Sequence, residues 1–299
     1  GDLEDGGPSY DAKECFARAV ECDGKLGDAW HMLADALSND TVEVHGVEFG
    51  KKACYVQALT LNPDSAACWL QLGDLGGAVM LTTEMSDTEC YARALEADSE
   101  YRDAWYALAK ALDSDERAIV EGVDYGREAC LIRTVEVDPM FGIAWYDLAQ
   151  LLEVGEPAEV NGTNYSKLGC LAQAVQGRPD LADAWFDLGN EVGAGKVHIN
   201  GKEYVAKACL EAALDANPKL AKAWLDLGNR LASDDQATVG GKSFGVRACY
   251  VKAAELEPDK PDAWCALARV MFGQDTVAVN GKEYTKGQVS DAMCSAKSS

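Results

Sequence analysis

Histidine and cysteine are the residues in this chain whose chemistry could serve catalysis or metal binding, and their spacing argues against both. The 299 residues include three histidines and eleven cysteines. His31, His45 and His198 lie in unrelated sequence contexts, and none has cysteines at the spacing of a zinc site. Neither a Gly-x-Gly-x-x-Gly motif after a strand nor a phosphate-binding loop is present. We therefore predict no enzyme, no catalytic residue, no metal site and no cofactor.

Most of the cysteines share one position of a repeating pattern. Equivalent positions of successive repeats lie about one repeat apart, which exceeds the ~7 Å Cα–Cα limit for a disulfide. We therefore expect small buried core residues at these positions, which are Cys15, Cys54, Cys90, Cys130, Cys170, Cys209 and Cys249. The disulfide state of the remaining four, Cys22, Cys68, Cys265 and Cys294, is left open.

Acidic residues dominate the charge of the chain, whose formal net charge is −23. This charge disfavours nucleic acid and anionic membranes as partners. The acidic groups at 113–117 and 233–235 lack the twelve-residue ligand spacing of a calcium-binding helix–loop–helix site, so we expect solvated turns there. No apolar run reaches the ~18 residues of a membrane span, and residues 1–5 do not resemble a signal peptide. We expect no membrane insertion, and a protein that is cytosolic or whose signal has been removed.

The tryptophans indicate where the helices of the repeats begin. All seven begin the motif Trp-x-x-Leu-[Gly/Ala], and the spacing of three and four residues places the motif on one face of a helix. They recur at intervals typical of a repeat architecture, at Trp30, Trp69, Trp105, Trp145, Trp185, Trp224 and Trp264. Each repeat therefore begins with an amphipathic helix.

A second helix follows in each repeat and usually carries the motif Cys-[Tyr/Phe/Leu]-x-x-Ala-[Leu/Val]. It is usually ended by a proline, which has no N–H to continue a helix; these prolines are Pro63, Pro139, Pro179, Pro218 and Pro258. Each repeat is thus predicted to be a helical hairpin.

These motifs resemble the tetratricopeptide repeat (TPR), whose pattern has Trp, Leu and Gly/Ala on the first helix, an aromatic residue and Ala on the second, and Pro at the close. The resemblance covers nearly the whole chain. It implies a mostly α fold, an α-solenoid wound as a right-handed superhelix, and a role in protein–protein contact. This chain departs from the family's 34-residue period by about five added residues between the helices. It is also loosely similar to long-period repeat proteins of kinetoplastid flagellates, a resemblance that implies no activity.

The added residues alternate apolar and polar side chains about a central pair such as Asn200-Gly201. Such a pair favours a two-residue β-hairpin, because a type I′ turn needs positive φ at both positions. The segment 77–85 is shorter and lacks the central glycine. We expect short hairpins along one edge of the solenoid. Stacked helices are ~9–10 Å apart and two strands occupy about that width, so we also expect successive hairpins to join into one antiparallel ribbon.

The repeats predict a single domain over residues 1–299. It comprises a half repeat at 1–27, full repeats at 28–66, 67–102, 103–142, 143–182, 183–221 and 222–261, and a degenerate last repeat at 262–299.

The first functional hypothesis is a structural protein that assembles end to end with other copies of itself into a helical filament. Monomeric solenoids normally have terminal repeats with polar outer faces, whereas the outer repeats here keep the interior pattern. The expected end-to-end interface consists of Cys15, Phe16, Ala19 and Val20 at one end and Trp264, Leu267 and Ala268 at the other.

The alternative is a cytosolic TPR adaptor that binds a protein or peptide partner in its concave groove. Asn190 and Asn229 follow Leu-Gly in adjacent repeats, where an amide could pair with a peptide backbone. The basic residues that carboxylate-binding members of the family carry after Trp are absent here.

Three N-glycosylation sequons begin at Asn39, Asn161 and Asn164. All three lie in or beside the segments between the helices, where a glycan would fit. They favour an extracellular or cell-surface location over a cytoplasmic one.

Overall fold

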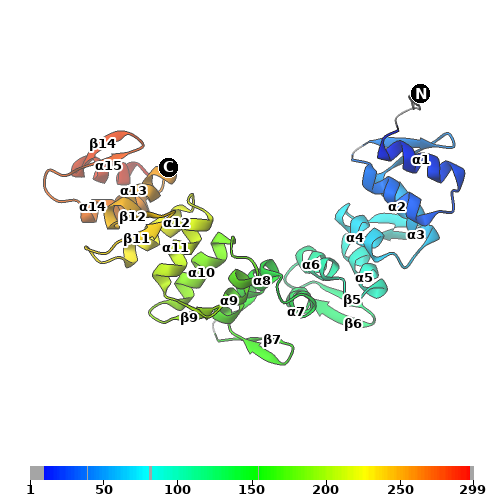
Figure 1. Ribbon diagram of the computed structural model, residues 1–299, viewed down its shortest axis with the longest axis horizontal. Coiled ribbons are helices and arrows are strands. Elements are labelled where there is room, and N and C mark those ends of the chain that lie inside the picture. Colours follow the sequence, from blue (N-terminus) through cyan, green and yellow to red (C-terminus); the bar gives the residue numbers. More distant parts are fainter. Residues whose placement is uncertain (1–9, 39, 81–82, 154, 297–299) are drawn as a thin grey trace, which may run out of the picture. The chain divides into compact units, whose positions relative to one another are not determined.

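The computed structural model describes residues 10–38, 40–80, 83–153 and 155–296, with side chains up to residue 292. In this part of the chain helices alternate with β-hairpins (Figure 1). The first helices of the repeats are α2 (Gly27–Ala36), α4 (Ala66–Asp74), α6 (Arg102–Ala111), α8 (Gly142–Leu151), α10 (Ala182–Val192), α12 (Ala221–Arg230) and α14 (Pro261–Val270). The second helices are α1 (Ala12–Cys22), α3 (Lys51–Leu61), α5 (Asp87–Ala97), α7 (Arg127–Val137), α9 (Lys167–Gly177), α11 (Ala206–Ala216), α13 (Val246–Leu256) and α15 (Lys286–Ala296).

Each pair of helices in a repeat is joined by a short antiparallel hairpin. The strands are β1 (Thr41–Val44), β2 (Val47–Gly50), β3 (Ala78–Met80), β4 (Thr83–Met85), β5 (Arg117–Val120), β6 (Val123–Gly126), β7 (Ala158–Val160), β8 (Thr163–Tyr165), β9 (Val197–Ile199), β10 (Lys202–Tyr204), β11 (Ala237–Val239), β12 (Lys242–Phe244), β13 (Thr276–Val279) and β14 (Lys282–Thr285). The predicted α-solenoid of helix–hairpin–helix repeats is therefore confirmed.

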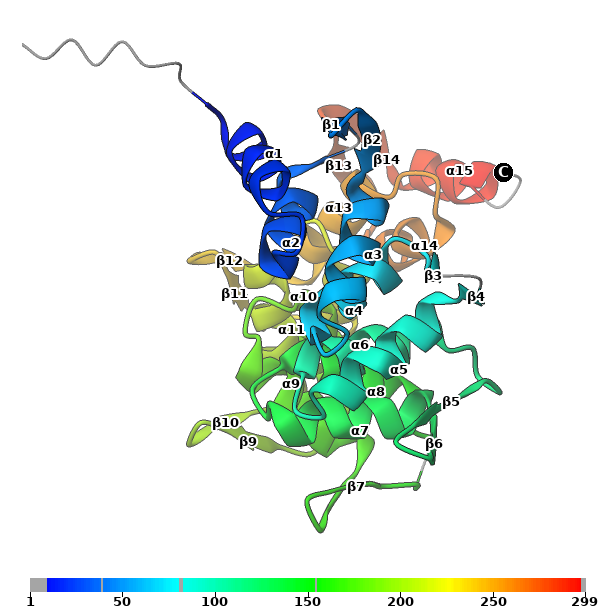
Figure 2. The ribbon, with the colours of Figure 1, turned by 90° about the vertical axis from the view of Figure 1, so that its right-hand side faces the viewer.

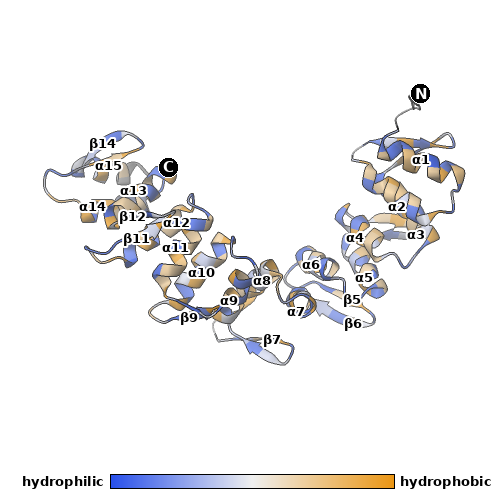
Figure 3. Ribbon diagram, in the orientation of Figure 1, coloured by the Kyte–Doolittle hydropathy of each residue, from blue (hydrophilic) through white to orange (hydrophobic). Residues whose placement is uncertain are grey.

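The chain divides into two compact units, residues 1–138 and 139–299. Unit 1 contains α1 to α7, and unit 2 contains α8 to α15. Within each unit the two helices of a repeat pack against each other, and the second helix also packs on the first helix of the next repeat. Hydrophobic and hydrophilic residues alternate along these helices, as in amphipathic helices (Figure 3). In unit 2 the hairpins β9–β10 and β11–β12 project from the same side of the helices (Figure 2).

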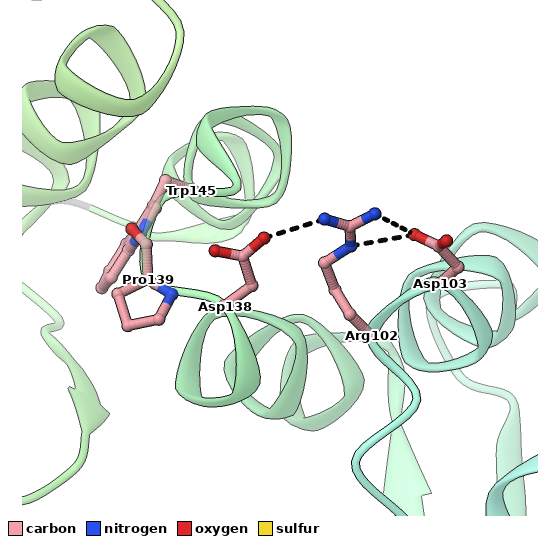
Figure 4. Close-up of polar contacts among 5 residues, drawn as sticks. All are labelled: Arg102, Asp103, Asp138, Pro139 and Trp145. Carbon is pink, nitrogen blue, oxygen red and sulfur yellow. Dashed lines mark hydrogen bonds and ion pairs between the residues drawn. The ribbon is translucent and has the colours of Figure 1, made fainter. Parts of the chain in front are cut away.

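The tryptophans are buried and contact other parts of their repeats. The indole Nε1 donates a hydrogen bond to the carbonyl oxygen six residues earlier, in the turn that precedes the helix, over 2.7–3.0 Å. In unit 2, Trp145 bonds to Pro139 in this way (Figure 4). In six repeats the ring also packs on an aromatic residue at the end of the hairpin, with centroids 4.8–5.2 Å apart: Phe49, Tyr125, Tyr165, Tyr204, Phe244 and Tyr284. Tryptophan therefore fastens the turn and the hairpin to the first helix.

A charged contact joins the two helices of one repeat in unit 1. The guanidinium of Arg102, at the start of α6, donates to Asp103 over 2.7 and 2.9 Å and to Asp138, beyond the end of α7, over 2.8 Å (Figure 4). The hydrogen bond to Asp138 is the main cause that raises the pKa of Arg102 above its ordinary value. Because these groups are partly exposed, we expect their contribution to stability to be small.

The hairpin turns have the predicted conformation. Both central residues have positive φ, for example Asn200 (51°) and Gly201 (75°). Glu121, the first central residue of the β5–β6 turn, also has positive φ (51°), although asparagine is the usual residue at this position. The segment 77–85 also forms a hairpin, with Val79 opposite Glu84, although its two central residues lie outside the described part. The hairpin conformation therefore tolerates considerable variation at the turn.

The expectation of one continuous ribbon is wrong. Each described hairpin is a separate two-stranded sheet. The reason is that the first strand packs on the second helix of the preceding repeat, as β11 does on α11 and β5 on α5. In unit 2 that helix also occupies the edge of the strand: Glu211 accepts a hydrogen bond from the N–H of Thr238 (2.8 Å), and Asp215 accepts one from Gly240 (2.7 Å). The preceding helix, and not the neighbouring hairpin, is the partner of that edge.

The repeat cysteines are buried, with the exception of Cys15 on α1, which is exposed. Burial raises the pKa of the Cys54 thiol to about 11 and that of Cys130 to about 12, so these thiols are protonated at neutral pH and poor nucleophiles. Cys22, Cys68 and Cys265 are free thiols, and the side chain of Cys294 lies outside the described part.

Candidate functional site

Asn190 and Asn229, the groove residues expected from the sequence, lie exposed at the same position of α10 and α12. The side-chain oxygen of Asn229 accepts a hydrogen bond from the hydroxyl of Tyr250 (3.0 Å), and that of Asn190 accepts one from Arg230 (2.8 Å). These bonds hold the two amides in place and leave their N–H donors for another partner. Asn229 also lies beside a large hollow.

The hollow has a volume of about 910 Å³ and lies where the ends of α12 and α14 meet the first half of α13. Its walls are largely apolar and include Phe244, Val246, Val251 and Val270, while Asn229 contributes an amide. This size falls within the roughly 300–1,000 Å³ range of ligand-binding sites. An apolar side chain of a partner would therefore find both room and contact area here.

Phe272 lies at the rim of this hollow and is 73% exposed. Single exposed apolar residues are common on protein surfaces, but this position is unusual among the repeats, because the equivalent residues are small or polar: Ser38, Gly77, Asp113, Glu153, Gly193 and Ala232. The backbone N–H of Phe272 donates to Asp275 (3.1 Å). That bond, together with Arg247, lowers the pKa of the Asp275 carboxyl, so Asp275 stays ionised and holds Phe272 at the rim.

Three cationic side chains also line the hollow. Arg247 forms an ion pair with Asp275, and Lys252 forms one with Glu255. Arg269 is exposed and makes no ion pair within the described part of the chain. A free guanidinium in a chain of such negative charge favours a partner group that is itself acidic.

The position of Asn229 is acidic in the repeats of Trp30 and Trp69 in unit 1, where the same hydrogen bond recurs. Tyr55 donates to Asp35 and Tyr91 donates to Asp74 (3.0 Å). Burial, followed by the bond to the carboxylate, raises the pKa of both phenols. Sequence reasoning missed this pairing, although a signal exists: tyrosine follows the repeat cysteine only in repeats where Asp or Asn follows the Gly/Ala. Leucine follows the cysteine in the other repeats and also in the repeat of Asn190, at Leu131, Leu171 and Leu210.

Three of the seven residues expected at an end-to-end interface are buried in the chain. Val20 and Leu267 are fully buried, and Trp264 is 3% exposed because it packs in its own repeat. Phe16, Ala19 and Ala268 are half-buried, and Cys15 is exposed.

Two of the sequons lie on the surface of one hairpin. Asn161 occupies the first central position of the β7–β8 turn, and Asn164 lies exposed on β8. The hydroxyl of Ser166, the third residue of the second sequon, accepts a hydrogen bond from the N–H of Gly169 and caps α9. Asn39 lies outside the described residues.

Other kinds of site find no support in the described part of the chain. No three His, Cys, Asp or Glu side chains lie together in a way that could hold a metal ion. None of the described helices combines the length and the apolar character needed to cross a membrane.

Comparisons with known proteins give one kind of likeness. No protein-family model and no curated protein matches the chain. Among solved structures it is similar to the crystal structure of YrrB, described as a TPR protein with an unusual peptide-binding site, with 19% identity over 71% of this chain and 97% of that chain and a TM-score of 0.44. The α-solenoid of this chain follows from its own helix order and packing, as described above.

Proposed function

We propose that this chain is a non-enzymatic interaction scaffold that binds a peptide segment of a partner protein in the hollow between α12, α13 and α14. The observation that carries the proposal is the exposed Phe272 at the rim of an apolar hollow, beside Arg269 and Asn229. The segment that fits has an apolar or aromatic side chain for the hollow and an acidic group for Arg269. The amide of Asn229 would hydrogen-bond its backbone.

A non-enzymatic role agrees with the chemistry of the titratable groups. The buried thiols have raised pKa values and are not nucleophiles at neutral pH. The buried tyrosines donate to Asp or Asn side chains that hold them within their repeats. These groups stabilise the helical hairpins.

The proposal can be tested with random heptapeptides displayed on phage and selected on the full chain. We expect the enriched peptides to combine an aromatic or large apolar residue with Asp or Glu. A synthetic copy of the best peptide, measured by fluorescence anisotropy, should bind at least tenfold more weakly to Phe272→Ser, because serine is the residue that another repeat has at this position. Arg269→Gln should weaken the acidic peptide about tenfold and leave its Asn or Gln analogue unchanged.

Arg230→Gln is the matched control, because Arg230 is exposed on α12 and does not line the hollow. Peptides that bind wild type and both hollow variants equally, or a selection that enriches no peptide, would refute the proposed site.

Self-assembly into a filament is the second candidate, with the accessible side chains of α1 as part of its expected interface. Cys15, Phe16 and Ala19 remain accessible on α1, whereas the equivalent Cys54 and Tyr55 are fully buried. A helix from a second copy could cover this surface. Glycans on Asn161 and Asn164 would accompany an extracellular filament.

Electron microscopy and mass spectrometry of native material test this second candidate together. We expect uniform fibres, hexose mass on the β7–β8 hairpin, and dissolution of the fibres by Phe16→Asp with helical content retained. A monodisperse monomer with unmodified asparagines would count against it.

A further inference from the structure

Within the described residues, the strand β5 in unit 1 has one backbone edge that pairs with no other strand. It pairs with β6 on one side only, and Val120 and Val123 form the pair that closes the turn. Hydrogen-bonded pairs alternate along an antiparallel ladder. Arg117 and Ile119 therefore direct their backbone N–H and C=O groups away from β6, toward the outside of the hairpin.

At the equivalent edge of β11, an outward-facing backbone N–H has a side-chain hydrogen-bond partner. There the N–H of Thr238 donates to Glu211 on α11. By register Thr238 corresponds to Ile119, and Glu211 corresponds to Ala92 on α5. Alanine has no acceptor, so the N–H of Ile119 has no side-chain partner within the described residues.

A hollow of about 680 Å³ lies along this open edge. Its floor is α5, where Ala92 takes the place of a larger side chain, and its other wall includes Met80 and Met85 of the β3–β4 hairpin. Ile119 is 68% exposed beside it. Methionine side chains are flexible and adapt to different apolar partners.

The charges around this hollow are unevenly satisfied. Glu89 accepts the N–H of Ser86 at the start of α5, and Glu96 pairs with Arg93 over 2.9 Å. Arg117 also lines the hollow and makes no ion pair in the described part of the chain. The groups without a partner in this hollow are thus the guanidinium of Arg117 and the outer backbone edge of β5.

We propose that an extended segment of a partner protein binds in this hollow and adds to β5 as a third strand. Its backbone hydrogen-bonds Arg117 and Ile119 at the usual ~4.8 Å strand spacing. Alternate side chains of the segment are apolar and contact Ala92, Met80 and Met85, and an acidic residue pairs with Arg117. This surface is separate from the hollow of unit 2 and rests on different observations.

The probe for the test is a fluorescein-labelled nonapeptide of alternating valine and threonine with one central glutamate, titrated onto the full chain. We expect saturable binding, and slowed exchange of the Ile119 amide when the peptide is bound. Ala92→Glu should weaken binding at least tenfold, because a carboxylate at this position caps the Ile119 N–H as Glu211 caps Thr238. A peptide N-methylated at alternate residues should lose binding to the same degree, because its backbone donors are removed.

Ala172→Glu is the matched control, since it places the same substitution at the same register of α9 and should leave binding unchanged. The proposal is overturned if the nonapeptide does not bind to the wild-type chain, or if bound peptide leaves the exchange of the Ile119 amide unchanged. It is also overturned if the Ala92→Glu chain binds the nonapeptide as tightly as wild type does and the wild-type chain binds the N-methylated peptide as tightly as the nonapeptide. The exchange measurement uses the wild-type chain, so it decides the question even if Ala92→Glu fails to fold.

Discussion

Replacing Trp224 with alanine is expected to lower the free energy of unfolding of its repeat by about 3–5 kcal/mol, the usual cost of removing a buried aromatic side chain. The substitution empties a buried site between α12 and the β11–β12 hairpin. It removes the ring that packs 4.8 Å from Phe244 and leaves the carbonyl of Pro218 without its 2.8 Å hydrogen bond. The hairpin and the preceding turn therefore lose their attachment together.

Because repeat proteins can unfold in parts, the measurement should be local. Amide exchange of the strands β11 and β12 should accelerate strongly, and a urea transition followed by circular dichroism should shift to lower concentration. Phe272→Ala is the control: its ring is 73% exposed, so its removal should change stability by less than about 0.5 kcal/mol. Unchanged exchange in β11 and β12 would show that tryptophan does not hold the hairpin.

Gly177→Ala is the second large effect, with an expected loss of about 2–4 kcal/mol from overpacking. A Cβ at Gly177, the last residue of α9, would lie 2.3 Å from the carbonyl oxygen of Met140. Backbone cannot move aside as a flexible side chain can, so α9 must shift away from the turn before α8. The intrinsic helix preference of alanine returns only about 1 kcal/mol.

Gly169→Ala gives the matched control on the same helix. A Cβ there would meet its nearest neighbour, a ring carbon of Tyr165, at 3.5 Å, which is ordinary contact. We expect this variant to be slightly more stable than wild type, by up to about 1 kcal/mol. Thermal unfolding of both variants tests the pair, and a Gly177→Ala protein as stable as Gly169→Ala would contradict the packing described for α8 and α9.

The fold could be predicted from the sequence because its signals are local and repeated. The Trp-x-x-Leu spacing defines a helical face, and pairs such as Asn200-Gly201 define a turn. The prediction that successive hairpins join into one ribbon was wrong, for a reason that the sequences of the strands do not show. The competing partner is a helix of the preceding repeat, and side chains such as Glu211 take the hydrogen bonds that a neighbouring strand would have used.

The candidate site was found only in part. Asn229 could be predicted because it repeats the position of Asn190, whereas Arg269 and Phe272 depart from the repeat and follow no pattern that predicts a site. Arg269 and Phe272 line the same hollow as Asn229 because both α12 and α14 pack on α13, although about forty residues separate them in the sequence. A comparison of the repeats for the one apolar residue at an otherwise small or polar position would have identified Phe272.

The double attachment of each hairpin has a consequence for how such an array can grow or shrink. The strand β11 is docked on α11 of the preceding repeat, while Phe244, at the end of the same hairpin, is locked to Trp224 of its own repeat. Deleting one repeat by recombination therefore brings together a hairpin and a helix that did not evolve as partners. Duplication stays neutral only when the copied segment carries a helix together with the hairpin that follows it. The segment that must be duplicated or deleted as a unit therefore runs from the second helix of one repeat to the end of the next hairpin. It crosses the repeat boundary that the tryptophan motif indicates.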